Sequence, residues 1–219
     1  AGTDLAGSID LEMTAADIPA DSQATADPAA AGQVTVALQG KGLRSGATSI
    51  ASLDLKGTVK DPLNAALTDA TLTANGMGGA ADINRVSMTA NGNRKGLVVA
   101  LQATGARTNA DIRGKVEPDG SDILISLSRL DGRHSGIPVA LTAPTRVRIA
   151  GQRIVLDPTN LRLGGGRLSV RGTIDPTASD LQLELAALPL SLVDAVAPGT
   201  GLEGTAQAKV QVRGAMAAP

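Results

Sequence analysis

Apolar and polar residues alternate along short stretches of the chain, and each stretch ends in turn-forming residues such as glycine or Asp-Pro. In RLSVRGTI, residues 167–174, leucine, valine and isoleucine alternate with arginine, serine and threonine. The alternation returns in DLQLELAAL, residues 180–188. A period of two places successive side chains on opposite faces of a β-strand, and such punctuation is typical of tight turns. The sequence therefore predicts an almost entirely β chain whose strands each have one apolar and one polar face.

Similar alternating units recur from one end of the sequence to the other. Many such units in a row predict an elongated, repetitive, solenoid-like sheet in which each strand covers only its neighbours. Hairpin turns are expected where the residue pairs tolerate a positive φ, namely at Asn75–Gly76, Asn91–Gly92, Asp119–Gly120 and Asp131–Gly132.

Two segments break this alternation. Residues 16–32 are small, polar and proline-containing, which favours a loop. Residues 190–196, LSLVDAV, have apolar residues at helical spacing, and we expect a short helical turn there.

The 219-residue chain contains no Phe, Tyr, Trp or Cys, although 42% of its residues are hydrophobic. Large aromatic side chains usually dominate core packing, so Leu, Val, Ile and Ala must hold this fold together. Such small side chains suit a thin sheet with many small contacts. The absence of Cys excludes disulfides, thiolate metal sites and thiol catalysis. A net charge of −1, without aromatics for base stacking, argues against nucleic acid as a partner.

Motifs for catalysis or cofactor binding are few, and each has a simpler explanation. Gly199–Gly204 matches GxGxxG, but a strand-like run follows it instead of the required helix. His134, the only histidine, lies in a predicted turn without a nucleophile elbow. The acidic stretch at residues 117–122 misses the spacing of a calcium loop. We expect a protein that is not an enzyme and has no metal or cofactor.

The use of the apolar face is the central question. In a sandwich, two sheets would bury their apolar faces against each other. An outer-membrane barrel would turn the face to lipid, but it needs aromatic girdles that this chain lacks. An open groove would suit acyl chains, because each CH₂ taken from water contributes about 0.8 kcal/mol without directional preference. Alternation alone leaves the sandwich and the groove open.

The C-terminal part of the sequence carries a family resemblance. Residues 161–219 contain LRLGGGRLSVRGTIDP and LQLELAALPLSLVDAVAPGTGLEGTAQAKVQVRGAMAAP. This region resembles the repeat region of the TamB family of AsmA-like envelope proteins. The resemblance implies a β-taco, a trough of β-sheet with a hydrophobic interior. It also implies a parent protein that is anchored in the inner membrane and crosses the periplasm. We interpret residues 1–219 as a single β-repeat segment from its interior, with the anchor outside this chain.

For function, the resemblance implies phospholipid transport between the inner and outer membranes in support of outer-membrane biogenesis. Phospholipid acyl chains are then the expected ligand. The implied protein partner is an outer-membrane barrel similar to TamA, bound through parts of the parent protein outside this chain. One alternative is a scaffold for translocation and assembly of outer-membrane β-barrel proteins, with unfolded clients bound by strand augmentation. Another is a structural β-solenoid spacer.

The candidate groove-lining residues are the apolar members of the later alternating stretches. They are Val147, Ile149, Ile154, Leu156, Leu161, Leu163, Leu168, Val170, Ile174, Leu181, Leu183, Leu185, Val210 and Val212.

Overall fold

The computed structural model describes residues 5–16, 32–46, 48–64, 66–78, 83–195 and 201–215. The prediction of an all-β, repetitive sheet is confirmed. The strands form a 14-stranded antiparallel sheet whose order follows the sequence, with only β9 off the main path. The strands are β1 (Leu5–Ala16), β2 (Gln33–Ser45), β3 (Thr48–Lys60), β4 (Leu67–Gly78), β5 (Arg85–Asn93), β6 (Gly96–Thr104), β7 (Thr108–Asp119), β8 (Asp122–His134), β9 (Ile137–Leu141), β10 (Thr145–Ala150), β11 (Arg153–Leu163), β12 (Gly166–Ile174), β13 (Ser179–Pro189) and β14 (Thr205–Gly214).

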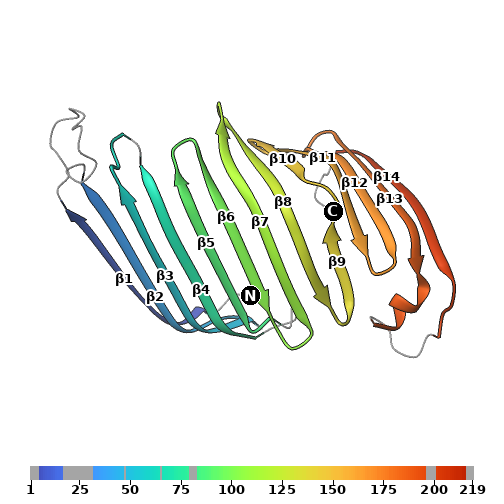
Figure 1. Ribbon diagram of the computed structural model, residues 1–219, viewed down its shortest axis with the longest axis horizontal. Helices are drawn as coiled ribbons and strands as arrows, with labels where there is room; N and C mark the ends of the chain where they lie inside the picture. The colour runs from blue at the N-terminus through green and yellow to red at the C-terminus, as the bar shows by residue number, and fades with distance from the viewer. Residues whose placement is uncertain are drawn as a thin grey trace. The chain divides into compact units, whose positions relative to one another are not determined.

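The chain divides into two compact units, Ala1–Asn109 and Ala110–Pro219. Figure 1 shows the strands of each unit lying side by side in sequence order. In unit 1, β1 to β6 form a meander of directly paired antiparallel neighbours. In unit 2, β10 to β14 continue in the same way, while the short β9 pairs with both β8 and β11. Strand pairing is therefore local in both units.

The register of unit 1 gathers its apolar residues on one face. Residues directly opposite each other in an antiparallel pair point to the same side of the sheet. One continuous row of such partners crosses six strands: Leu11, Leu38, Leu55, Leu72, Met88 and Leu101. The alternate residues form polar rows on the other face, such as Asp10, Gln39, Asp54, Thr73, Ser87 and Gln102.

Burial is shallow in both units. Within the described ranges, the buried apolar residues are Ala74, Ala90 and Ala103, and no large side chain is fully buried. The main contacts between elements join neighbouring strands of the sheet. Leu, Val and Ile are therefore covered mainly by their cross-strand neighbours, not by a second layer of described elements.

The predicted turns were only partly correct. Asp119–Gly120 does lie at the turn between β7 and β8, where Gly120 has φ +65°. The other three pairs lie inside β4, β5 and β8. Gly92 shows the reason: a Cβ there would lie 2.1 Å from the carbonyl oxygen of Gly96 on β6. The glycine thus serves a close approach of two strands, and the turn follows after Asn93, whose Oδ1 accepts the Lys95 N–H at 2.8 Å.

The two predicted breaks in the alternation have different outcomes. The expected helical turn is present as a 3-10 helix, η2 (Leu190–Ala195). Of the expected loop at residues 16–32, Ala16 ends β1 and Gly32 precedes β2, and residues 17–31 lie outside the described residues.

Candidate functional site

The candidate groove-lining residues of unit 2 all lie on one face of its sheet, called here the apolar face of unit 2. Direct cross-strand pairing links them from β10 to β14. The linking pairs are Val147 with Leu156, Ile149 with Ile154, Ile154 with Ile174, Leu161 with Leu168, Leu168 with Leu185, Val170 with Leu183, Leu183 with Val210, and Leu181 with Val212. Leu163 joins this face through its partner Gly166.

A β-bulge in β11 is needed for this arrangement. Leu156 pairs with Gly172 but Thr159 pairs with Val170, so β11 takes three steps where β12 takes two. A one-residue shift turns all following side chains to the other face. The extra residue therefore keeps Leu161 on the face that Leu156 occupies, although their numbers differ by an odd count.

Two threonine hydroxyls hold this bulge. Thr145 is 5% exposed, and its Oγ1 lies 2.8 Å from Oγ1 of Thr159. The Thr159 hydroxyl donates to the carbonyl oxygen of Asp157 at 3.0 Å. The bulge is thus fixed from the neighbouring strand β10, in one of the few buried polar spots of unit 2.

A second bulge lies in β13. Leu185 pairs with Ala208 and Leu188 with Ala206, so β13 takes three steps where β14 takes two. The extra residue therefore lies in β13. Ala187 within this bulge has φ +52°, a left-handed conformation that alanine rarely adopts. As a result, Leu188 stays on the same face as Leu185 just before the strand ends.

One row of cross-strand partners on the apolar face of unit 2 contains a glycine. This row consists of Leu156, Gly172, Leu181 and Val212. Gly172 lies between Leu156 and Leu181, has φ +134°, and a Cβ there would lie 2.0 Å from the Asp180 carbonyl oxygen. Only glycine fits this close backbone approach. The apolar face therefore has a position without a side chain between two leucines.

Exposure varies across the apolar face of unit 2. The residues on β10 to β13 are half-buried between their neighbours. On β14, at the end of the strand order, Val210 is 50% and Val212 is 44% exposed. The face thus remains partly open to solvent, and most open at the last strand.

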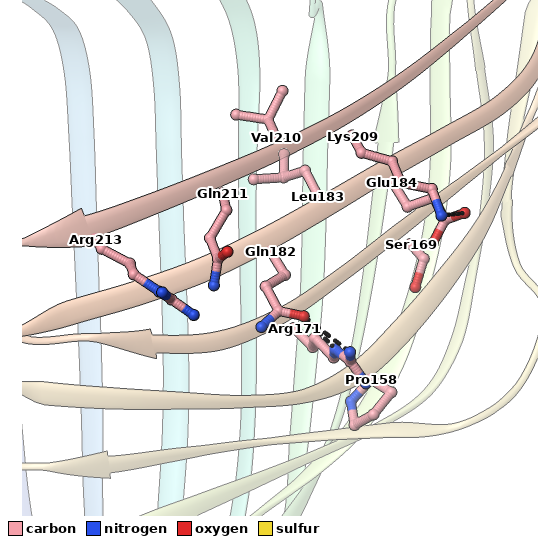
Figure 2. Close-up of a pocket in the computed structure, with 10 residues that line it drawn as sticks. All are labelled: Pro158, Ser169, Arg171, Gln182, Leu183, Glu184, Lys209, Val210, Gln211 and Arg213. Carbon is pink, nitrogen blue, oxygen red and sulfur yellow. Dashed lines mark hydrogen bonds and ion pairs between the residues drawn. The ribbon is translucent and has the colours of Figure 1, made fainter.

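The opposite face of β11 to β14 is a polar ladder around a shallow hollow (Figure 2). Figure 2 shows Leu183 and Val210 pointing away from the side on which Gln182 and Gln211 lie. Arg171 donates to Gln182 Oε1 from Nε at 3.0 Å and from Nη2 at 2.8 Å. Lys209 Nζ lies 3.0 Å from Glu184 Oε1. These polar groups satisfy one another, so the hollow is a solvated strand face and not a prepared ligand site.

Other residues considered from the sequence also have structural roles. Arg148 Nη1 lies 2.5 Å from Asp119 Oδ2 and 3.6 Å from Asp122 Oδ2, and Lys115 pairs with Glu117. The carboxylates of the acidic stretch are thus paired with basic side chains. Arg146 and Arg153 are exposed, which is typical of a solvated strand face. Within the described ranges, no cluster of His, Asp and Glu could hold a metal ion.

The glycine-rich motif ends in a strand, as expected. Its described part, Gly201–Gly204, leads directly into β14, and Gly199 lies outside the described residues. The turn is fixed by the Leu190 N–H, which donates to the carbonyl oxygen of Gly204 at 2.9 Å. No helix N-terminus follows the motif, so the geometry of a dinucleotide site is not present there.

The candidates chosen from the sequence missed the equivalent face of unit 1. Its apolar rows end at β1, where Ile9, Leu11 and Met13 are 61%, 62% and 66% exposed. The signal was in the sequence, because SIDLEM (residues 8–13) alternates as clearly as DLQLEL (residues 180–185). The candidates were confined to the later stretches and so left unit 1 out.

Comparisons of the chain with protein-family models, with curated proteins and with solved structures found no significant match. Among the described residues, no helix is both long and apolar enough to cross a membrane. The fold defines an all-β chain with a repetitive antiparallel sheet, and in each unit one face is apolar and the other polar.

Proposed function

We propose that this chain is a segment of a hydrophobic track that carries phospholipid acyl chains between two membranes and supports outer-membrane biogenesis. The observation that supports this function is that each unit has an apolar face that continues from strand to strand, without a second layer of described elements over it. Acyl chains are chemically similar to the Leu, Val and Ile side chains of this face. Burying each CH₂ contributes about 0.8 kcal/mol, without a fixed orientation.

The setting of this track follows from the resemblance to the TamB family. It is the periplasm, with the chain as an interior part of a protein anchored in the inner membrane. An outer-membrane barrel similar to TamA binds other parts of that protein. On this proposal, the polar face of each unit meets water while the apolar face meets lipid.

A binding experiment with matched variants tests this function. The purified chain is incubated with vesicles of phosphatidylethanolamine and phosphatidylglycerol and then analysed by native mass spectrometry for bound phospholipid. A Val170→Lys/Leu183→Lys variant places charge at two directly opposite residues of the apolar face. A Ser169→Lys variant adds charge to the neighbouring residue on the polar face, opposite Glu184.

We expect bound phospholipid on the wild type and on Ser169→Lys, and its loss on Val170→Lys/Leu183→Lys. Circular dichroism must show that all three chains keep their β structure. Absence of lipid from the wild type would contradict the proposal and would favour a structural spacer. Equal binding by the folded Val170→Lys/Leu183→Lys variant would place the lipid elsewhere.

The open edges of the sheet favour a second candidate, the scaffold for outer-membrane protein assembly. β1 and β14 each pair with one neighbour in the described sheet, so one row of backbone groups on each can accept another strand. A photo-crosslinking residue in place of Val210, which lies on the apolar face of β14 and is 50% exposed, would distinguish the two candidates in cells. Recovered outer-membrane polypeptides would support the scaffold, and recovered phospholipid would support the track.

A further inference from the structure

Two arginines lie directly opposite each other on the polar face of unit 2. Arg162 on β11 is the cross-strand partner of Arg167 on β12, and both residues are exposed. Like charges at directly opposite positions destabilise an antiparallel pair. Both strands lie inside the sheet, because β11 also pairs with β9 and β12 also pairs with β13. The fold therefore holds two positive charges side by side at a cost to its own stability.

The neighbouring strands do not neutralise this arginine pair. In the same row, its cross-strand neighbours are the uncharged Ala140 on β9 and Ala186 on β13. Among the described residues, neither arginine has a partner in a hydrogen bond or an ion pair. Arg171, on the same strand as Arg167, differs because it donates to Gln182 Oε1 through two nitrogens. The guanidinium N–H groups of the arginine pair thus remain available as donors.

The arginine pair lines a hollow of about 480 Å³ on the polar face. This hollow adjoins the one drawn in Figure 2, and the two share Ser169 and Glu184. Asn160 also lines it and is the direct cross-strand partner of Ser169, in the row next to the arginines. An amide and a hydroxyl group therefore add neutral hydrogen-bond donors to the two charged ones.

The carboxylates on this part of the polar face have basic partners of their own. Glu184 Oε1 lies 3.0 Å from Lys209 Nζ, as the dashed line in Figure 2 shows. Asp131 lies in the row of the arginine pair, beyond Ala140, and its Oδ2 is 3.9 Å from Arg129 Nη2. With both carboxylates paired in this way, the net charge beside the hollow is positive.

We propose that Arg162 and Arg167 together bind a doubly charged phosphate group, either a phosphate monoester or inorganic phosphate. Two guanidinium groups carry two positive charges, and a phosphate monoester carries a charge of about −1.5 to −2 at neutral pH. Each guanidinium can donate two parallel N–H bonds to phosphate oxygens. A bound dianion also removes the repulsion between the strands. A carboxylate or a phosphate diester has one charge and would neutralise only one arginine.

This site goes beyond the proposed function, because it lies on the face opposite the acyl-chain track. Calorimetric titration of the purified chain with inorganic phosphate, in chloride buffer at neutral pH, tests it. We expect Arg162→Gln/Arg167→Gln to bind phosphate at least about tenfold more weakly than the wild type, since charged hydrogen bonds are lost. Arg167→Lys keeps the charge but not the planar fork, so its affinity should be intermediate.

A matched control separates the arginine pair from the general charge of the face. Arg146 and Arg153 are exposed arginines whose cross-strand partners on β8 and β10 are Ser126 and Ala150. An Arg146→Gln/Arg153→Gln variant therefore loses the same charge without breaking a pair of arginines. It should bind phosphate within about twofold of the wild type, because the charged donors at the site remain.

Urea unfolding gives a second measurement on the same chains. Phosphate should raise the midpoint of the wild type but not that of Arg162→Gln/Arg167→Gln, because a ligand stabilises only the fold that binds it. Without phosphate, this double variant should be at least as stable as the wild type, because the repulsion between β11 and β12 is gone. A lower midpoint without phosphate would contradict the repulsion on which the proposal depends.

Vesicle flotation distinguishes the two sources of phosphate. Phosphatidylcholine vesicles are prepared with phosphatidic acid, a monoester, or with the same fraction of phosphatidylglycerol, a diester. If phosphatidic acid vesicles bind the wild type better than Arg162→Gln/Arg167→Gln, the site accepts a lipid headgroup. If only the calorimetric titration shows binding through the arginine pair, the ligand is free phosphate. Equal binding to phosphatidylglycerol through the arginine pair would contradict the choice of a dianion.

Three further results would overturn the proposal. One is a wild type that binds no phosphate even at millimolar concentration. Another is an equal loss of affinity in Arg146→Gln/Arg153→Gln, which would show that phosphate follows only the charge of the whole face. The third is displacement of bound phosphate by an equal concentration of an aspartate-rich peptide, which would assign the arginine pair to an acidic protein segment.

Discussion

Leu183 on β13 lies directly opposite Val210 on β14, and the two side chains differ in how much of their surface the fold covers. Leu183 is half-buried between two neighbouring strands, whereas Val210 on the last strand is 50% exposed. This gradient across adjacent strands is expected when a face is covered mainly by its own neighbours. The loss of unfolding free energy on truncating a side chain should therefore be larger at Leu183 than at Val210.

Truncation of these two residues should therefore cost little by the standards of a globular core. We expect Leu183→Ala to lower the free energy of unfolding by about 1–2 kcal/mol, below the ~2–5 kcal/mol of a buried leucine. Val210→Ala should cost about 0.5 kcal/mol. Urea unfolding followed by circular dichroism measures both. A loss as large as that in a closed core at Leu183 would mean that a further layer covers this face.

Two glycines of the apolar rows should respond differently to alanine. At Gly172, φ is +134° and the added Cβ would lie 2.0 Å from a backbone oxygen, so Gly172→Ala should cost at least about 2 kcal/mol. Gly57 on β3 is the matched control, because its Cβ would lie 3.8 Å from the Ala70 Cβ in ordinary contact. Gly57→Ala should change stability by less than about 1 kcal/mol. Equal effects in urea unfolding would contradict this account of the Gly172 backbone.

The hydroxyl group of Thr145 should contribute more to the free energy of unfolding than its methyl group. Thr145→Val removes the hydrogen bond between the two threonine hydroxyls and the longer one, 3.4 Å, that Thr145 Oγ1 donates to the Asp157 carbonyl oxygen, at a residue that is 5% exposed. We expect a loss of about 1 kcal/mol, typical of one hydrogen bond, because Thr159 keeps its hydrogen bond to the Asp157 carbonyl oxygen. Thr145→Ser keeps the hydroxyl and should restore most of the loss. If serine were as destabilising as valine, packing and not hydrogen bonding would hold the bulge.

Asp175 should make the turn between β12 and β13 sensitive to acid. Its Oδ1 accepts hydrogen bonds from Thr177 Oγ1 at 2.7 Å, from Thr177 N at 2.8 Å and from Ala178 N at 3.3 Å. The hydrogen bond from the Thr177 hydroxyl is the main reason that the pKa of Asp175 is below its ordinary value. A lowered carboxyl pKa stabilises the fold at neutral pH, and this contribution is lost as the pH falls below about 4 towards the folded pKa.

Urea midpoints at a series of pH values test this dependence. The wild type should be more stable than Asp175→Asn at neutral pH, and the difference should shrink in the acid range. Thr177→Val should weaken the dependence, while Thr177→Ser should keep it. A difference between the wild type and Asp175→Asn that stays constant with pH would show that the carboxylate charge is not involved.

Much of this fold could be predicted from the sequence because the side-chain period is two. Alternation at Leu168 and Val170, or at Leu181 and Leu183, determines both the strand and the face. The turn after Asp175 follows from Asp-Pro, and the break at η2 from the helical spacing of apolar residues. These signals are local, so a single sequence contains them.

What could not be predicted depends on the partner strand. Gly92 looks like a turn residue, but its role is the close approach to Gly96 on β6. The bulge before Thr159 cannot be recognised from β11 alone, because it appears only when two strands are aligned. Leu156 and Leu161 are five residues apart, so strict alternation along β11 would place them on opposite faces.

Because contacts in each unit run between neighbouring strands, each strand has to fit only the strands beside it, and no shared core links all of them. Each added hairpin widens such a face by two strand spacings, each about 4.8 Å, and needs only to match the strand before it. A chain of this kind can change its reach through gain or loss of hairpins, without repacking any interior. Length is then a quantity that gene duplication can adjust in steps, while the chemistry of the surface stays the same.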